Sequence, residues 1–184
     1  MRAPRSRLEN LGLLTVRLAP GLLVAGHGAQ KLFGSFDGLG MEKWTTATES
    51  MGLRPPKVWA VLGAGSELGG GVLTAAGALS PVGPIVMGSA MISATVKGHW
   101  GKPIWSTKGG AELAVSFLSA AAVAGTVGPG AYSVDSLLGI RVPKWMTGLT
   151  VVGGVLLLAE AIHPTVAPKF AVPPATDTSG EEAE

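Results

Sequence analysis

The feature that most constrains this chain is a long apolar stretch, Val58 to Leu79, in which Glu67 is the single charged residue. A second stretch of similar length, Leu11 to Phe33, is interrupted by Arg17, His27, Gln30 and Lys31. Both stretches are long enough to cross a bilayer as helices. Inserting a charge at the centre of such a helix costs roughly 2.5 to 3.5 kcal/mol, so ionisable residues there are expected to face the bundle interior and mark a functional site.

The composition favours a membrane protein. Charged residues make up 14% of the chain, against about 25% in an ordinary soluble domain. The mean hydropathy is +0.41, and 28 residues are glycine. Small residues let membrane helices approach each other closely, so this glycine content suits lipid-embedded helices better than a soluble helical protein. We therefore predict an all-α, polytopic membrane helix bundle.

Charge and cysteine usage exclude several classes of function. The net charge of +2 comes from basic residues scattered among apolar segments and short loops, so no single face is basic and nucleic acid is not an expected partner. The chain has no cysteine. It therefore cannot carry out dithiol exchange, bind an iron–sulfur cluster through thiolates, or attack a substrate through sulfur.

Five apolar segments are predicted to span the membrane: Leu11–Phe33, Val58–Leu79, Val82–Trp100, Ala111–Val127 and Trp145–Ile162. The first is longer than the apolar core of a typical signal peptide, so we expect a retained helix. Residues 1–163 are predicted to form one transmembrane bundle domain. Residues 164–184, rich in proline, small residues and glutamate, are predicted to be a disordered acidic tail.

The connection from Gly34 to Lys57 is long for a bundle and carries a helical pattern. Its apolar residues Met41, Trp44, Ala47 and Met51 share one helical face. This spacing predicts a short amphipathic helix that lies at the interface or caps the bundle; the alternative is a solvated loop.

Alternation of the five spans gathers most polar residues on one side of the membrane. We call the side that holds the N-terminus side A and the opposite one side B. The residues expected on side B are His27, Gln30, Lys31, Lys97, His99, Lys102, Trp105, Lys108, Glu112, Glu160 and His163. For Lys102, Trp105 and Lys108, anchoring at the membrane interface explains this placement better than a site does. For His27, Lys31 and Glu112 we predict one shared pocket.

Glu67 projects from a stripe of small residues, so a neighbouring helix can pack tightly over it. Counting about 1.5 Å per residue from the expected helix ends puts Arg17 and Glu67 at nearly the same depth. We therefore expect an ion pair between them. Such a pair could fix the register of the bundle or take part directly in chemistry, and the sequence leaves both open.

Several segments together resemble the DoxX family of small bacterial membrane proteins. They are RLAPGLLVAGHGAQKLFG from Arg17, the loop GLGMEKWTTATESMGLRPP, Glu67 among its glycines, HWGKPIWSTKGGAE and GPGAYSVDSLLG. The likeness extends over most of Leu11 to Leu138, and the order and spacing of the segments carry it. It implies a four-helix membrane core, to which this chain adds a fifth transmembrane helix.

Members of this family are linked to redox reactions, and one of them is the membrane subunit of a thiosulfate:quinone oxidoreductase. The polar positions that the resemblance matches are Arg17, Lys31, Glu67, His99 and Glu112. It also implies location in the bacterial plasma membrane. Arg2, Arg5 and Arg7 favour a cytoplasmic N-terminus, whereas side B carries more lysine and arginine overall, spread over a longer loop. We expect the N-terminus inside.

Two functional hypotheses follow. In the first, the chain is a quinone-interacting or redox-associated subunit: Glu67 and Glu112 carry protons, and His27, Lys31, His99 and Trp105 hold the quinone. In the second, it is a non-catalytic anchor or scaffold of a larger complex, because the chain holds no complete catalytic constellation. We expect no haem or metal. The expected partners are the lipid bilayer and either further copies of the chain or other membrane redox subunits.

Overall fold

The computed structural model describes residues 5–162, and these residues form seven α-helices and two short 3₁₀ helices without any strand. The elements in chain order are α1 (Arg7–Phe33), η1 (Ser35–Asp37), α2 (Gly40–Ser50), α3 (Pro56–Ala76), α4 (Val82–Gly98), η2 (Ser106–Lys108), α5 (Glu112–Val127), α6 (Val134–Leu138) and α7 (Lys144–Ile162). The fold class is all-α, as predicted. The acidic tail predicted over 164–184 lies outside the described residues.

The five long helices α1, α3, α4, α5 and α7 coincide with the five predicted segments to within a few residues at each end. The largest difference is at the start of α1, which begins four residues earlier than the apolar run. The cause is a capping box, in which the Ser6 hydroxyl accepts from the Glu9 N–H and the Glu9 carboxylate accepts from the Ser6 N–H. The helix ends at Gly34, whose φ of 72° suits glycine.

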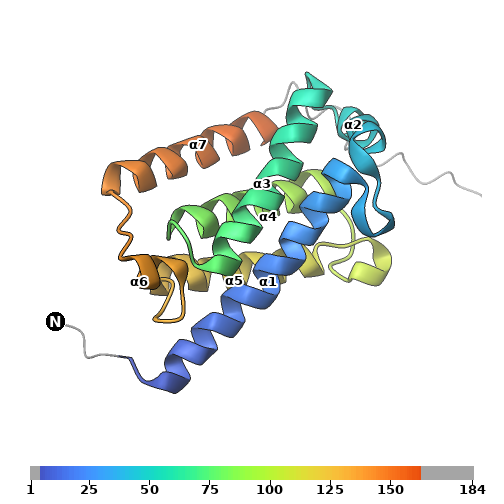
Figure 1. The fold of residues 1–184 in the computed structure, drawn as a ribbon. Coiled ribbons are helices and arrows are strands. Elements are labelled where there is room, and N and C mark those ends of the chain that lie inside the picture. The colour runs from blue at the N-terminus through green and yellow to red at the C-terminus, as the bar shows by residue number, and fades with distance from the viewer. Residues whose placement is uncertain (1–4, 163–184) are drawn as a thin grey trace, which may run out of the picture.

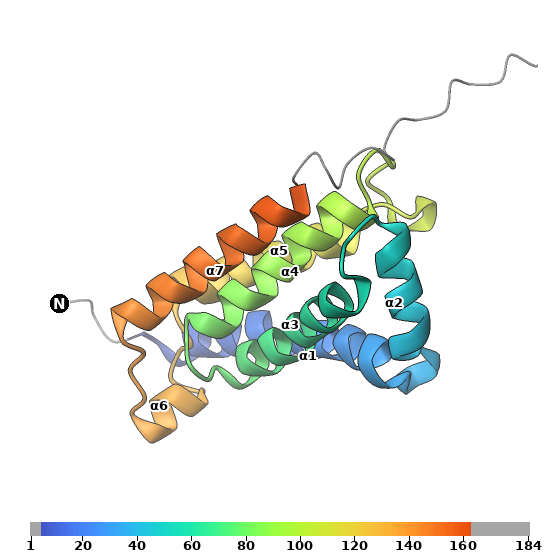
Figure 2. The same cartoon turned by 90° about the horizontal axis from the view of Figure 1, so that it is seen from above.

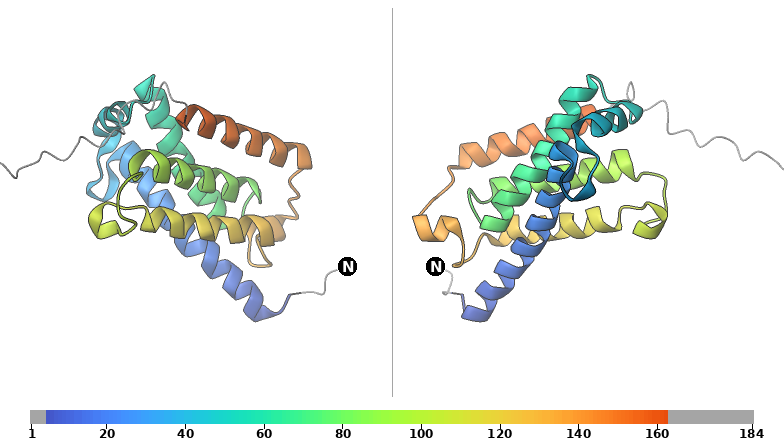
Figure 3. Two further views of the ribbon diagram at one scale, coloured as in Figure 1. Left: turned by 180° about the vertical axis from the view of Figure 1, so that it is seen from behind. Right: turned by 45° about the vertical axis from the view of Figure 1, so that its right-hand side comes forward.

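The long helices run back and forth between the two sides, with α4 near the centre (Figures 1 and 2). Helix α4 packs against α3, α5 and α7, while α1 packs against α3 and α5. The predicted amphipathic helix is α2, and it lies across the side-B ends of α1 and α3 (Figure 2). The short α6 lies at side A, and α7 forms an outer layer (Figure 3).

Helices α1 and α3 meet along a seam of small residues. A Cβ at Gly21 would lie 2.7 Å from the backbone nitrogen of Ala75, and one at Gly28 would lie 2.4 Å from that of Leu68. From the other side, a Cβ at Gly71 would lie 2.6 Å from the nitrogen of Ala25. Any side chain at these glycines would collide with backbone, so the seam fixes the register of α1 against α3.

Small residues fill the interior while large apolar ones point outward. The buried apolar residues are mostly alanines, with Val24, Met87, Met91 and Phe117 as larger members. By contrast, Leu22, Leu23, Leu149 and Leu156 are 56%, 58%, 64% and 61% exposed. An exposed apolar surface of this extent marks an interaction with lipid or protein. Within the described residues, α1 is the one helix that is both long and apolar enough to span a membrane, and α5 and α7 are shorter apolar helices.

Candidate functional site

A cavity of about 560 Å³ lies on the side-B half of the bundle, between α2, α3, α4 and α7. Its walls are mainly apolar or small side chains. Residues that line it include Trp44, Thr48, Met51, Leu53, Trp59, Leu62, Gly63, Ser66, Val86, Ser89, Ala90, Ser93, Ala94, Thr150, Gly153, Gly154 and Leu157. Four titratable residues also line it: Lys31, Glu67, Lys97 and His99. The cavity is therefore apolar over most of its surface, with ionisable groups concentrated among a few residues.

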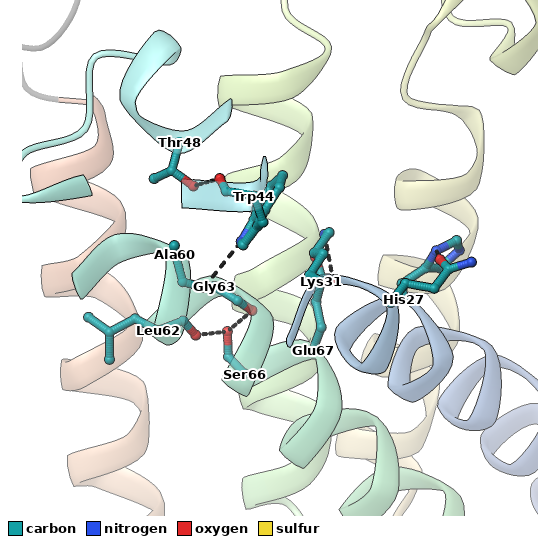
Figure 4. A network of polar contacts seen from close by, with 10 residues as sticks. His27, Lys31, Trp44, Thr48, Ala60, Leu62, Gly63, Ser66 and Glu67 are labelled. Atoms are coloured by element: carbon teal, nitrogen blue, oxygen red, sulfur yellow. Dashed lines mark hydrogen bonds and ion pairs between the residues drawn. The ribbon is translucent and has the colours of Figure 1, made fainter. Parts of the chain in front are cut away.

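The central polar contact is an ion pair between Lys31 of α1 and Glu67 of α3 (Figure 4). The Lys31 ammonium donates to both carboxylate oxygens, with Nζ 2.6 Å from Oε2. Glu67 is 5% exposed, so its charge is buried inside the bundle. The pair is reached from the cavity, because both residues line it.

Trp44 of α2 covers this ion pair. The Lys31 Nζ lies 4.5 Å from the centroid of the Trp44 ring, which is cation–π geometry. The indole Nε1 of Trp44 donates to the carbonyl oxygen of Ala60 on α3 at 3.1 Å. Trp44 thus fastens α2 to α3 and shields the charged pair, as Figure 4 shows.

The position of the ion pair follows from the glycine seam. Gly28 packs against Ala64 and Leu68. Glu67 lies between Ala64 and Leu68 in α3, and Lys31 is one turn from Gly28 in α1, so its long side chain reaches the Glu67 carboxylate. The small residues around Glu67 predicted a close approach of a neighbouring helix. That helix is α1, and its approach brings Lys31 next to Glu67.

The predicted Arg17–Glu67 ion pair is wrong. Arg17 donates instead to three backbone carbonyls, those of Ala75, Pro129 and Tyr132, with Nε 3.1 Å from the oxygen of Pro129. The depth estimate failed because the glycine seam sets the register and places Arg17 beside the end of α3. Ala75 is eight residues from Glu67, which is about 12 Å along a helix.

His99 follows α4 and is held by the loop before α5. Its Nδ1 lies 2.7 Å from the carbonyl oxygen of Gly109. A carbonyl only accepts, so Nδ1 carries a proton and Nε2 of the neutral ring remains an acceptor. His99 lines the cavity together with the buried Lys97.

Three of the predicted site residues lie outside the cavity, so the prediction that His27, Lys31 and Glu112 share one pocket is wrong. The His27 ring is exposed, and its Nδ1 lies 3.0 Å from the accepting side-chain oxygen of Gln30. The centroid of the ring lies 6.3 Å from that of Phe117. Glu112 accepts from the N–H and the hydroxyl of Ser106, both at 2.9 Å. Trp105 is 59% exposed.

His27 and Glu112 miss the cavity for different reasons. His27 is four residues before Lys31 on α1 but faces α5, whereas Lys31 faces α3. Glu112 opens α5, and its short side chain is taken up in closing the loop around Ser106. The side chain of Glu160 and all of His163 lie outside the part of the chain that is described.

Sequence reasoning missed a second polar cluster, which lies at side A. There Asp135 of α6 accepts from the N–H groups of Leu79 and Ser80, each at 2.8 Å. Asn10 donates to the Ser6 carbonyl and accepts from the Ala131 N–H. A second hollow of about 490 Å³ adjoins Arg17 and Tyr132. The partners of this cluster are backbone atoms in turns, so no residue pattern marks them in the sequence.

The described residues contain no group of three or more His, Cys, Asp or Glu side chains able to hold a metal ion.

Comparison with known proteins identifies the family. The DoxX family model matches residues 12–100, which run from the first turns of α1 to just past the end of α4. The chain belongs to the DoxX family and is a membrane protein of that family. No curated protein and no solved structure matches the chain. The match ends before α5, so it is shorter than the likeness seen over Leu11 to Leu138, and α5 to α7 lie beyond it.

Proposed function

We propose that this DoxX protein is a quinone-binding, redox-associated membrane subunit, and that the cavity beside the Lys31–Glu67 pair is its quinone site. The observation that carries the proposal is the combination of a largely apolar cavity with the ammonium of a buried ion pair and a histidine. A quinone head is complementary to this lining, because its ring is flat and apolar, its carbonyl oxygens accept from an ammonium, and a hydroxyl of its reduced form can donate to Nε2 of His99.

The cavity fits such a ligand in size and chemistry. Small-molecule sites in proteins are typically about 300–1,000 Å³, mostly apolar, with a few polar groups that fix orientation. The cavity has a volume of about 560 Å³ and two tryptophans, Trp44 and Trp59, in its wall. Lys31 has three N–H donors, of which two serve Glu67. One donor is left for a carbonyl.

The residues have separate tasks in this proposal. Lys31 binds and orients a carbonyl oxygen, and Glu67 holds the ammonium in place. Glu67 Oε2 and His99 Nε2 would each take up one proton and pass it to a quinone oxygen as the ring is reduced. When bound, a quinone supplies two-electron, two-proton chemistry, and the electrons come from a partner redox subunit. Trp44 and α2 exclude water from the charged pair.

The test is quinone binding to protein purified in mild detergent. Lipid extraction and titration with added quinone are compared for the natural chain, Lys31→Met, Glu67→Gln and His99→Leu. We expect all three variants to retain less quinone. The matched control is Glu49→Gln, which breaks an exposed ion pair with Arg54, whose Nη1 lies 2.5 Å from Glu49 Oε1; neither residue lines the cavity. A natural chain without bound or bindable quinone contradicts the proposal.

One observation favours the alternative, a non-catalytic anchor or scaffold. The outer face of α7 presents Leu149, Val152, Val155 and Leu156, all more than half exposed, in positions where a second copy or another subunit could pack. If this is the function, Glu67→Gln impairs assembly but leaves electron transfer by assembled complexes intact. Mass spectrometry of co-purifying proteins, together with electron-transfer assays, separates the two functions.

We further propose the bacterial plasma membrane as the location, with the N-terminus in the cytoplasm. The chain has no cysteine, so single cysteines can report orientation without background. Lys108→Cys reports side B and Leu137→Cys reports side A, and both positions are exposed. Labelling of Lys108→Cys in intact cells by an impermeant maleimide supports the proposed orientation, and labelling of Leu137→Cys contradicts it.

A further inference from the structure

On its outer side the cavity is bordered by two helices, α3 and α7, that do not pack against each other. Helices α3 and α7 each pack against α4 but barely touch each other. Both nevertheless line the cavity, α3 with Leu62, Gly63 and Ser66, and α7 with Thr150, Gly153 and Leu157. The cavity therefore extends outward between α3 and α7, over the face of α4.

Two glycines lie on the two edges of this gap. Gly63 is seven residues from the start of α3 and Gly153 nine from the end of α7, which puts them at similar depths of about 10 and 13 Å from side B. A Cβ at either glycine would meet nothing within 4 Å. Neither glycine is needed for close helix packing, in contrast to those of the α1–α3 seam. Leu62 and Leu157 beside them are 42% and 40% exposed.

The route from the aqueous phase at side B is covered. Helix α2 and the loop after it contribute Trp44, Thr48, Met51 and Leu53 to the cavity wall. Thr48 is 1% exposed and Leu53 9% exposed, so this cover is well packed. The hydrogen bond from Trp44 to Ala60 fastens it to α3.

The basic side chains of the cavity lie towards side B. Lys97 and His99 are at the end of α4 and Lys31 is near the end of α1, whereas Glu67 is eleven residues into α3, at a depth of about 16 Å. Going back along α4 from Lys97, Ser93 and Ser89 follow at four-residue intervals on the same helical face, and Val86 lies deeper still. The lining residues deeper than Glu67, Val86 and Thr150, carry no charge. This distribution matches an amphiphile whose head lies at the Lys31–Glu67 pair and whose tail lies in the membrane.

We propose that the gap between α3 and α7 is a lateral portal, and that the ligand is a long-tailed amphiphile that enters from the bilayer and leaves its tail in the gap. For the identity of the head this inference rests on the proposed quinone function. It adds the ligand class, an isoprenoid-tailed quinone, and it assigns α7, which lies outside the DoxX match, a part in the site.

The experiment fills the portal and leaves the charged residues themselves unchanged. Gly63→Leu and Gly153→Leu place a side chain in the gap, and leucine also raises helix propensity, so both variants are expected to fold. Gly65→Leu on α3 and Gly148→Leu on α7 are matched controls, because a Cβ there also meets nothing within 4 Å and neither residue lines the cavity.

Binding is measured in nanodiscs of phosphatidylethanolamine and phosphatidylglycerol, with an isoprenoid-tailed quinone and with the same head lacking a tail. We expect the portal variants to bind the tailed quinone about tenfold more weakly, the effect of excluding about two methylene groups. They should bind the tail-less quinone like the natural chain, and the controls should bind both normally. Unchanged binding of the tailed quinone, or equal loss of both ligands, overturns the portal.

A second readout separates failure of the portal from failure of the quinone proposal. A phospholipid with a diazirine on its acyl chain is photolysed in the same nanodiscs, and labelled peptides are mapped. The portal is supported, even if no quinone binds, when the natural chain is labelled at Ser89 or Ser93 and the Gly153→Leu variant is not. An α4 free of label in a chain that also binds no quinone overturns both proposals.

Discussion

Side A and side B each bury a charged residue of α1 or α3, but the two sides neutralise it differently. At side A, Arg17 is 3% exposed and donates to three backbone carbonyls. At side B, Glu67 is 5% exposed and is matched by another side chain, Lys31. The Arg17 cluster ties together the ends of α3 and α5, whereas the Lys31–Glu67 pair lines a cavity.

The difference separates structural from functional use of a buried charge. Backbone carbonyls cannot move without moving the helix ends, so Arg17 acts as a fixed clamp. Lys31 and Glu67 sit on flexible side chains and can exchange one hydrogen bond for a ligand. Stability measurements at side A and binding measurements at side B test this contrast.

The largest expected effect is at side A. Arg17→Leu leaves three carbonyls without their donor, and we expect a loss of about 3–5 kcal/mol in the free energy of unfolding, as for other broken buried charge networks. Arg17→Lys should recover less than half of the loss, because one ammonium cannot replace the guanidinium fork. Denaturant unfolding in detergent measures both. Stability equal to the natural chain would mean that side A is not a clamp.

At side B, Lys31→Met leaves Glu67 buried and unpaired, so we expect a loss of about 3 kcal/mol. The double variant Lys31→Met with Glu67→Met should regain most of this stability, because replacing both partners of a buried pair by apolar residues is often neutral. It should not regain quinone binding. Recovery of binding in the double variant would show that the pair is structural, like Arg17.

The clamp at side A includes Asp135, which accepts from two N–H groups in the α3–α4 turn. Asp135→Asn removes the charge and one acceptor, and we expect a loss of about 2 kcal/mol. Thermal unfolding in detergent measures this loss. Quinone binding at side B should stay unchanged, and a parallel loss of binding would argue against treating the two sides as separate.

A smaller effect is expected for Trp44→Leu. This change removes the cation–π contact with Lys31 and the hydrogen bond to Ala60, together about 1 to 2 kcal/mol. Hydrogen exchange should increase in Gly40–Ser50, because α2 loses its fastening to α3. Protection equal to that of the natural chain would mean that Trp44 does not hold the cover in place.

The smallest effect is expected at the exposed pair of Glu49 and Arg54, whose side chains are 50% and 67% exposed. Glu49→Gln should change neither stability nor binding measurably, since surface ion pairs contribute about 0–1 kcal/mol. Unfolding and quinone titration of this variant set the baseline. A clear change in either would show that the effects at Lys31 are not specific to burial.

Much of the fold could be predicted from the sequence. Apolar runs of this length form helices, and the polar breaks between the runs mark where each helix ends. The face formed by Met41, Trp44 and Ala47 also predicted α2. The gathering of polar residues at side B followed from counting spans. The part of this prediction that concerns Lys31, Lys97 and His99 agrees with the cavity.

The pairing of side chains could not be predicted by depth alone. The register of α1 against α3 is set by backbone contacts at Gly21, Gly28 and Gly71, and a shift of a few residues decides whether Arg17 or Lys31 meets Glu67. The hydrogen bonds of Asp135 could not be predicted either, because the carboxylate accepts from backbone N–H groups whose positions depend on the conformation of the α3–α4 turn.

The loose attachment of α7 has a consequence for how such a protein can diversify. Helix α7 packs mainly against α4, with Gly154 close to the Ser89 hydroxyl, and takes no part in the α1–α3 seam. Substitutions along its inner face can therefore reshape one wall of the chamber while the register-setting contacts stay intact. In a chain built this way, ligand preference and folding can change independently.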